Sequence, residues 1–127
     1  MNILLDTHVL LWWDQQDRHL GAPARALIAD PANQVFSSAA SIWEIAIKRR
    51  RGKLRFEGSA LALIDANGFH ELPILAEDAE AAGGLEWAHN DPFDRLLVAQ
   101  ARRGTFTLLT ADAVIRTYPG IVQLWAA

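Results

Sequence analysis

The sequence contains no cysteine, and this absence excludes two kinds of site. Neither a disulfide framework nor a thiolate metal site can form, so any bound metal must be held by oxygen and nitrogen ligands. Long hydrophobic runs are also missing, because the apolar stretches fall far short of the ~20 residues that a membrane-spanning helix needs. The start of the chain lacks the basic flank of a signal peptide. We therefore expect no membrane segment and a cytoplasmic protein.

Neither sign of charge dominates, since 12 basic residues face 15 acidic ones and the net charge is -3. This weak acidity argues against a protein that coats nucleic acid nonspecifically. The basic residues are unevenly placed, and half of them fall in one short run: Lys48, Arg49, Arg50, Arg51, Lys53 and Arg55. Two interpretations are open for this run. It is either a local surface that binds phosphates or the solvated end of a helix, where cations lie near the negative pole of the dipole.

The length and the order of local patterns predict the fold. A chain of 127 residues, 51% of them hydrophobic, suits one domain over residues 1–127 and is too short for two ordinary ones. Strands are expected at residues 2–5, 34–36, 69–72, 106–109 and 121–124. Helices are expected after a cap at Thr7 and at residues 22–29, 39–51, 59–66, 77–83 and 92–103, with a helical turn at 113–116. This alternation predicts an α/β fold of three layers, with a central, mostly parallel sheet flanked by helices.

The segment from Asn90 to Arg95 predicts a helix entrance that carries two carboxylates. Asp91 suits the N-cap position and Pro92 the first helical position, which leaves Asp94 one turn inside the helix. Arg95 could contact a substrate phosphate or pair with Asp91, and pairing is favoured slightly.

Three further acids stand where a strand or a strand-to-helix join is expected to end. Asp6 and Asp112 follow two of the strands, and Glu44 belongs to the helix that starts after another. In a parallel sheet the carboxyl ends of the strands meet at one edge, where ligands bind. We therefore expect Asp6, Glu44, Asp94 and Asp112 to form one acidic cluster.

Each acid taken alone has an ordinary structural explanation. Asp6 could simply end a strand, and Asp112 could cap a helical turn. Asp94 could be the third residue of a capped helix. Glu44 fits a capping box with Ser41 poorly, because the serines before Ala39 offer an earlier helix start and leave Glu44 nearly two turns inside.

Taken together, the four carboxylates predict a metal site. They would repel one another by about 4 kcal/mol per close pair at an effective dielectric constant near 20, so some would bind protons if no cation were present. Carboxylate oxygens without cysteine or clustered histidine suit Mg²⁺ or Mn²⁺ better than zinc. Such a site is built for hydrolysis, most naturally of a phosphodiester, with one ion activating water and a second able to stabilise the leaving oxygen.

The remaining polar and aromatic candidates are open to two interpretations each. Thr110 could bind a metal-bound water or satisfy the backbone. His8 and His89 lie near the acids in sequence, but structural roles are favoured because neither has a second histidine at ligand spacing. The five tryptophans could stack on bases, although core or interface roles are favoured: Trp12, Trp13, Trp43, Trp87 and Trp125.

Four segments occur in order along nearly the whole chain: Ile3 to His8, Ser41 to Ile45, His89 to Ala101, and Leu108 to Asp112. Together they resemble the PIN-domain ribonucleases and, among them, the VapC-like toxins of type II toxin–antitoxin pairs. Matched by position, Thr110 corresponds to the polar support of the family's site and Asp91 to its Asp-Pro-Phe-Asp signature. The catalytic, metal-binding quartet of the family corresponds to Asp6, Glu44, Asp94 and Asp112.

The resemblance implies a PIN-like domain that acts as a Mg²⁺-dependent endoribonuclease, with Mn²⁺ as a substitute ion. It implies cleavage of RNA, often structured cytoplasmic RNA such as transfer RNA, and arrest of growth when the toxin is unopposed. It also implies a homodimer and a cognate antitoxin protein that blocks the site.

Two other classes of protein are weighed against this one. A phosphate-signalling receiver needs an acidic pair after its first strand and a lysine near the end of its fifth, whereas Asp6 stands alone and the only lysines are Lys48 and Lys53. A catalytically silent PIN-like module that binds RNA or protein would lack one or more of the four acids, all of which are present. That module is the alternative to the enzyme.

Overall fold

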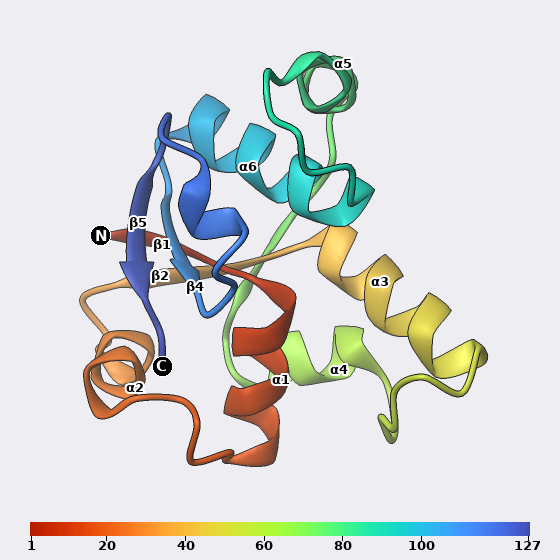
Figure 1. The fold of residues 1–127 in the computed structure, drawn as a ribbon. Helices are drawn as coiled ribbons and strands as arrows, with labels where there is room; N and C mark the ends of the chain where they lie inside the picture. Colours follow the sequence, from red (N-terminus) through yellow and green to blue (C-terminus); the bar gives the residue numbers. More distant parts are fainter.

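A five-stranded sheet forms the centre of the computed structural model, which describes all 127 residues (Figure 1). The strands are β1 (Asn2–Leu5), β2 (Gln34–Ser38), β3 (His70–Leu72), β4 (Thr107–Thr110) and β5 (Val122–Trp125). Their order is β3-β2-β1-β4-β5, and every neighbouring pair is parallel. The predicted α/β fold is confirmed, and the sheet is entirely rather than mostly parallel.

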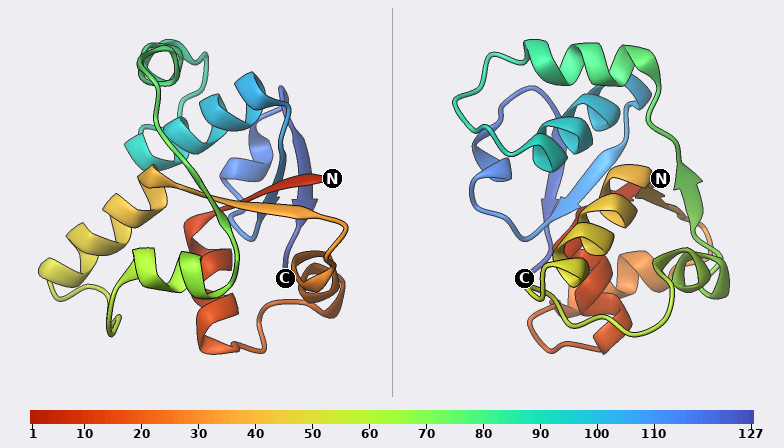
Figure 2. Two further views of the ribbon diagram at one scale, coloured as in Figure 1. Left: turned by 180° about the vertical axis from the view of Figure 1, so that it is seen from behind. Right: turned by 90° about the vertical axis from the view of Figure 1, so that its right-hand side faces the viewer.

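Helices cover both faces of the sheet (Figures 1 and 2). They are α1 (Thr7–Gln15), α2 (Ala22–Ala29), α3 (Ala39–Arg50), α4 (Ala60–Ala66), α5 (Ala76–Gly84), α6 (Pro92–Gly104) and the short 3₁₀ helix η1 (Ile115–Thr117). Alternate residues of β1 face opposite sides, as strand geometry requires. Ile3 and Leu5 pack in the core cluster beneath α1, α2, α3 and α4, and Leu4 packs in the cluster beneath α6.

None of the helices combines the length and the apolar character that a membrane crossing would require.

The elements lie within two residues of the predicted ranges, but the cap of α1 differs. Asp6 is the N-cap, because its Oδ1 accepts a hydrogen bond from the backbone N–H of Val9 at 2.8 Å. Thr7 is the first helical residue, and its hydroxyl lies 2.7 Å from Oε1 of Glu44 on α3. The predicted cap at Thr7 is therefore wrong, and the difference leaves the Thr7 side chain free to join α1 to α3.

Candidate active site at the carboxyl edge of the sheet

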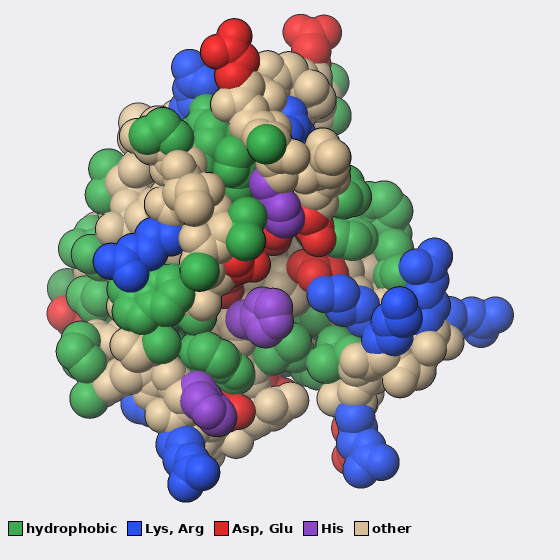
Figure 3. All heavy atoms as spheres, viewed as in Figure 1, with side chains coloured by type: hydrophobic (Ala, Val, Ile, Leu, Met, Phe, Trp, Pro, Cys, Tyr) green, Lys and Arg blue, Asp and Glu red, His purple; other side chains and the backbone are tan.

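A small pocket with acidic walls lies where β1 and β4 end and where α3 and α6 approach them. Its volume is about 60 Å³. The carboxylates around it are those of Asp6, Glu44, Asp91, Asp94 and Asp112. Figure 3 shows red acidic side chains in the hollow at the centre of this face, with blue basic side chains to their right. All four predicted acids therefore lie around one pocket, and Asp91 adds a fifth carboxylate.

Asp6 is the most buried of the pocket acids, with 2% of its surface exposed. Besides capping α1 through Oδ1, it accepts hydrogen bonds at Oδ2 from the Thr110 hydroxyl (2.5 Å) and the Ala111 amide (3.1 Å). Burial raises the pKa of Asp6 above its usual value, and these hydrogen bonds offset the effect only in part. The carboxylate is held in one orientation, yet its charge is poorly solvated.

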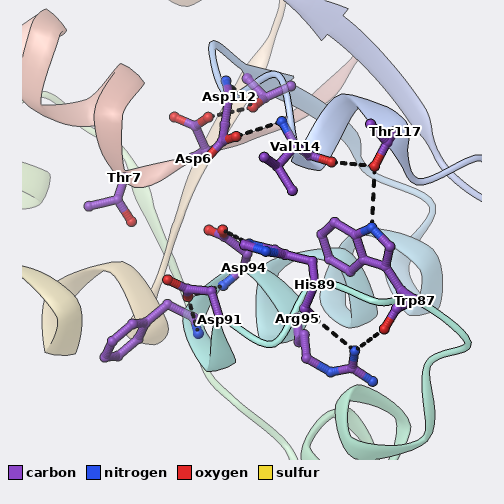
Figure 4. Close-up of polar contacts among 12 residues, drawn as sticks. Asp6, Thr7, Trp87, His89, Asp91, Asp94, Arg95, Asp112, Val114 and Thr117 are labelled. Carbon is purple, nitrogen blue, oxygen red and sulfur yellow. Dashed lines mark hydrogen bonds and ion pairs between the residues drawn. The ribbon is translucent and has the colours of Figure 1, made fainter.

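Thr110 links Asp6 to Asp112 at the end of β4. Its hydroxyl oxygen donates to Asp6 and accepts a hydrogen bond from the Asp112 backbone N–H at 3.0 Å. The Asp112 carboxylate in turn accepts at Oδ1 from the Val114 amide at 2.8 Å (Figure 4). The position of Asp112 at the pocket is thus set by a turn that Thr110 and Val114 fasten at both ends.

Glu44 lies inside α3 and is 4% exposed. Because the cap of α3 is Ser38, Glu44 takes no part in a capping box. Its Oε1 accepts from the Thr7 hydroxyl at 2.7 Å, and its Oε2 lies 2.5 Å from Nζ of Lys48, one turn further along the helix. The hydrogen bond to Glu44 raises the pKa of Lys48, so its ammonium is firmly retained beside the pocket.

Asp91 and Asp94 have different roles at the start of α6. Oδ1 of Asp91 accepts from the amides of Phe93 (2.9 Å) and Asp94 (3.1 Å), so Asp91 is the predicted N-cap. The pKa of Asp94 is raised to about 6, mainly by burial and further by the negative charges of Asp91, Asp112 and Glu44, and the hydrogen bond with His89 offsets this only in part. Asp94 is therefore mostly ionised at neutral pH and takes up a proton as the pH falls through about 6.

The donor groups of the pocket fit a hard divalent cation. Five carboxylates and one imidazole line it, against the single ammonium of Lys48. The pKa values of Asp6 and Asp94 are both raised, so the folded protein disfavours the charged form of both carboxylates when no cation is bound. Oxygen ligands in excess of the local positive charge are the set that Mg²⁺ or Mn²⁺ prefers.

A parallel sheet with this acidic edge agrees with a comparison against known families, in which the model described as "PIN domain" matches residues 3–121. The chain belongs to the PIN domain family. Among curated proteins it is similar to ribonuclease VapC22 of Mycobacterium tuberculosis, with 26% identity over 97% of this chain and 98% of that protein.

Solved structures give the same fold for this PIN domain. VapBC2 from Rickettsia felis, bound to a DNA fragment from their promoter, aligns over 100% of both chains with a TM-score of 0.70 and 14% identity. VapC20 of Mycobacterium tuberculosis, a toxin that cleaves the sarcin-ricin loop, aligns over 94% of this chain and 96% of that one, with a TM-score of 0.65 and 17% identity.

His89 belongs to the site of this PIN domain, although the sequence favours a structural role for it. Its Nε2 lies 2.7 Å from Oδ2 of Asp94, and donor atoms of His89, Asp91 and Asp94 all lie within 4.8 Å of one another. The signal in the sequence is the position of His89 just before the helix entrance. It is weak, because the chain must turn back between His89 and Asp94 for the two side chains to meet.

Arg95 does not pair with Asp91, so the favoured interpretation is wrong. Its guanidinium points away from the pocket and donates at 2.7 to 3.0 Å to carbonyls in the last turn of α5 and in the loop that follows it (Figure 4). The acceptors are the carbonyls of Ala82, Leu85, Trp87 and His89. Arg95 thus fixes the loop that delivers His89 to Asp94, and we call residues 82–89 the clamped loop.

The clamped loop is also tied to the turn that carries Asp112. The indole N–H of Trp87 donates to the Thr117 hydroxyl at 3.3 Å, and its ring packs edge-on against Tyr118 with 5.4 Å between the centroids. His89 packs against Trp87 at 4.9 Å. Trp87 therefore joins the two segments on which His89 and Asp112 stand.

The basic run after Glu44 is not one uniform surface. Lys48 is bound to Glu44, and Arg49 donates to the carbonyls of Phe56 (3.3 Å) and Gly58 (2.6 Å), so both have partners inside the protein. The exposed cations of the run that make no such contact are Arg50, Arg51, Lys53 and Arg55. Only this part of the run is free to meet a ligand.

Three tryptophans pack against the core, in agreement with the favoured interpretation: Trp12, Trp13 and Trp87. Trp43 is 53% exposed and meets Phe93 edge-on with 5.1 Å between the centroids. Trp125, on the outer strand β5, is 39% exposed and lies under the guanidinium of Arg116.

Proposed function

We propose that this PIN domain is an endoribonuclease that hydrolyses RNA phosphodiester bonds with Mg²⁺, for which Mn²⁺ can substitute. The observation that carries the proposal is the pocket at the carboxyl edge of the sheet, where five carboxylates surround a space lined by one ammonium. The choice of RNA is supported by the similarity to a ribonuclease, VapC22, and the nuclease role also by the likeness to VapC20, a toxin that cleaves the sarcin-ricin loop.

In this proposal the metal is held by Asp6, Glu44, Asp94 and Asp112. A bound divalent ion supplies an acidified water and stabilises negative charge on the phosphate. The protein supplies orientation, since Asp6 is fixed by Thr110 and Asp94 is held by His89. Asp91 acts on the site by capping the helix that carries Asp94.

The surface that meets the RNA backbone is assigned to the free cations of the basic run. Arg50, Arg51, Lys53 and Arg55 are exposed at the end of α3 and in the segment after it, so they can approach phosphates. Lys48 and Arg49 contribute to RNA binding only indirectly. Lys48 pairs with Glu44 of the acidic pocket, and Arg49 holds the segment after α3 through the carbonyls of Phe56 and Gly58. Because the net charge is -3, this local patch must supply most of the electrostatic attraction.

We assign the protein the role of a toxin in a toxin–antitoxin pair, arresting growth when unopposed. The partners are then a cognate antitoxin, a second copy of the chain in a homodimer, and an RNA such as a transfer RNA, all in the cytoplasm. The resemblance of the motifs to VapC-like toxins supports this assignment, as does the similarity to VapC20 and VapBC2.

Cleavage of RNA by the purified protein, free of any antitoxin, tests the proposal. With Mg²⁺ and total RNA, the wild type should give products that EDTA abolishes, and Asp94→Asn or Asp6→Asn should give none. Asp65→Asn is the matched control, because it makes the same chemical change at an exposed acid on α4, outside the pocket. Activity that survives in both pocket variants would overturn the mechanism. Binding of RNA without products under either ion would favour the catalytically silent module.

A further inference from the structure

A second cavity opens from the acidic pocket, between α1 and α3, with a volume of about 250 Å³. The two spaces share a wall made by Thr7, His8, Glu44 and Lys48. We call the second one the α1/α3 groove. The groove is therefore within reach of a group that adjoins a phosphate in the acidic pocket.

The walls of the groove differ in chemistry from those of the acidic pocket. Trp12 lines it as an aromatic surface, beside apolar residues such as Leu54. The ring of Trp12 is supported by His19, stacked on it with 5.7 Å between the centroids and an interplanar angle of 29°. The groove thus offers a large, braced aromatic ring of the kind on which nucleobases stack.

The charges around the groove favour an anionic ligand. Lys48 and Lys53 both line it, and the side chain of Lys53 is exposed and makes no hydrogen bond or ion pair within the protein. Glu44 is the only acid in its lining, and both of its oxygens are occupied, one by Thr7 and the other by Lys48. An aromatic wall with free positive charge and no free carboxylate suits a nucleotide better than a basic peptide.

We propose that the α1/α3 groove is the subsite for the nucleotide next to the scissile phosphate. Its base stacks on Trp12, and Lys53 meets its backbone. Gln15, which also lines the groove, is placed to hydrogen-bond a base edge. The inference rests on the proposed function, because an RNA held at the acidic pocket is what brings a nucleotide to this position.

Titration of the full chain with nucleoside 5'-monophosphates in Mg²⁺ tests the subsite without any cleavage. The indole N–H signals of the five tryptophans are followed by NMR and assigned by their loss in single Trp→Phe variants. The Trp12 signal should shift with the four monophosphates, and ribose 5-phosphate, which has no base, should leave it unmoved. A Trp12 signal that moves with no nucleotide would overturn the proposal.

Variants separate stacking from folding. Trp12→Ala should weaken binding of the monophosphates about tenfold, in the range known for base stacking, whereas Trp12→Phe keeps a ring and should lose less. Because Trp12 is half-buried, Lys53→Gln gives a second test at an exposed position, with an expected loss of a few fold that salt diminishes. Trp125→Ala, on the far strand β5, is the control and should bind like the wild type.

Kinetics on a mixed-sequence RNA oligonucleotide distinguish failure of this inference from failure of the proposed function. Trp12→Phe and Lys53→Gln should raise KM and leave kcat nearly unchanged, whereas Asp94→Asn should abolish kcat. Cleavage by the wild type, with KM unaltered in both groove variants, would keep the nuclease and overturn the subsite. Nucleotide binding at Trp12 without cleavage by the wild type would keep a nucleotide site in the groove and overturn the nuclease.

Discussion

Nε2 of His89 lies 2.7 Å from Oδ2 of Asp94, and this contact holds one oxygen of the Asp94 carboxylate (Figure 4). The negative charges of Asp91, Asp112 and Glu44 act on the same carboxylate. Oδ1 of Asp94 has no hydrogen-bond partner in the protein, so it is the oxygen available to a cation. The contact with His89 favours the charged carboxylate, but burial and the neighbouring acids outweigh it. Asp94 therefore changes its protonation state in mildly acidic solution, near pH 6.

The pH dependence of RNA cleavage should follow the protonation of Asp94. The pKa of Asp94 is about 6, so the carboxylate that binds the metal is lost as the pH falls through 6. At low, fixed Mg²⁺, we expect the cleavage rate to fall about tenfold for each pH unit below that value. More Mg²⁺ should move the midpoint to lower pH, because the ion competes with the proton. A rate that stays flat down to pH 4.5 would contradict this assignment.

The stability of the metal-free protein should rise when Asp94 loses its charge. A carboxyl group whose pKa is raised by folding destabilises the folded state once it ionises, and the stability is lost as the pH rises through about 6. At pH 7.5 in EDTA, Asp94→Asn should therefore be more stable than the wild type by up to about 3 kcal/mol. Urea unfolding measures the difference, which should vanish near pH 4. Mg²⁺ should reverse the order by stabilising only the wild type. A less stable Asp94→Asn in EDTA would refute the prediction.

Arg95 should affect turnover through the clamped loop rather than by binding substrate. Arg95→Lys cannot serve four carbonyls, so we expect a loss of about 2 kcal/mol in the free energy of unfolding. It should also lower kcat, because His89 no longer holds Asp94, and leave KM and its salt dependence unchanged. His89→Ala is the matched variant and should lower kcat alike while leaving the loop clamped. A raised KM with a weaker salt dependence would instead indicate that Arg95 contacts a phosphate.

The acidic pocket was predictable because its members carry local signals. Asp6 and Asp112 follow apolar strands, and the carboxyl ends of parallel strands must meet at one edge. Asp91 and Pro92 mark the start of α6, which fixes Asp94 one turn inside. Glu44 is recognisable because the serine cap before Ala39 places it too deep in its helix to act as a cap. The position of each acid therefore follows from the residues next to it in the sequence and from the meeting of parallel strand ends at one edge of the sheet.

The parts that the sequence did not reveal depend on contacts between distant segments. Arg95 lies in the first turn of α6, just after two acids, and nothing local indicates that its guanidinium turns back to the clamped loop. Gly104 looks like a helix stop, yet the left-handed residue after α6 is Thr105, with φ of 54°. Gly104 has another reason to lack a side chain, because a Cβ there would lie 2.1 Å from the ring of Phe106.

The ion pair between Asp78 and Arg103 should be the strongest electrostatic tie outside the pocket. The Asp78 side chain on α5 is fully buried and bonds to Nε (2.5 Å) and Nη2 (3.1 Å) of Arg103 on α6, and to the Leu75 amide (2.9 Å). Burial alone would raise the pKa of Asp78, but the bonds from Arg103 and Leu75 outweigh it and hold the pKa below its usual value. The stability from this pair is therefore present above about pH 4 and is lost as the pH falls further.

Arg103→Met keeps the long apolar stem of the side chain but leaves a buried carboxylate without its cation. We expect a loss of about 3 kcal/mol in the free energy of unfolding at pH 7, shrinking in acid as Asp78 takes up a proton. Adding Asp78→Asn should restore part of the loss, since the buried charge is then gone, and urea unfolding of the four forms gives the coupling. Strictly additive losses would show that the pair does not hold α5 on α6. Cleavage per folded molecule should be the same in all four forms, because neither side chain lines the acidic pocket.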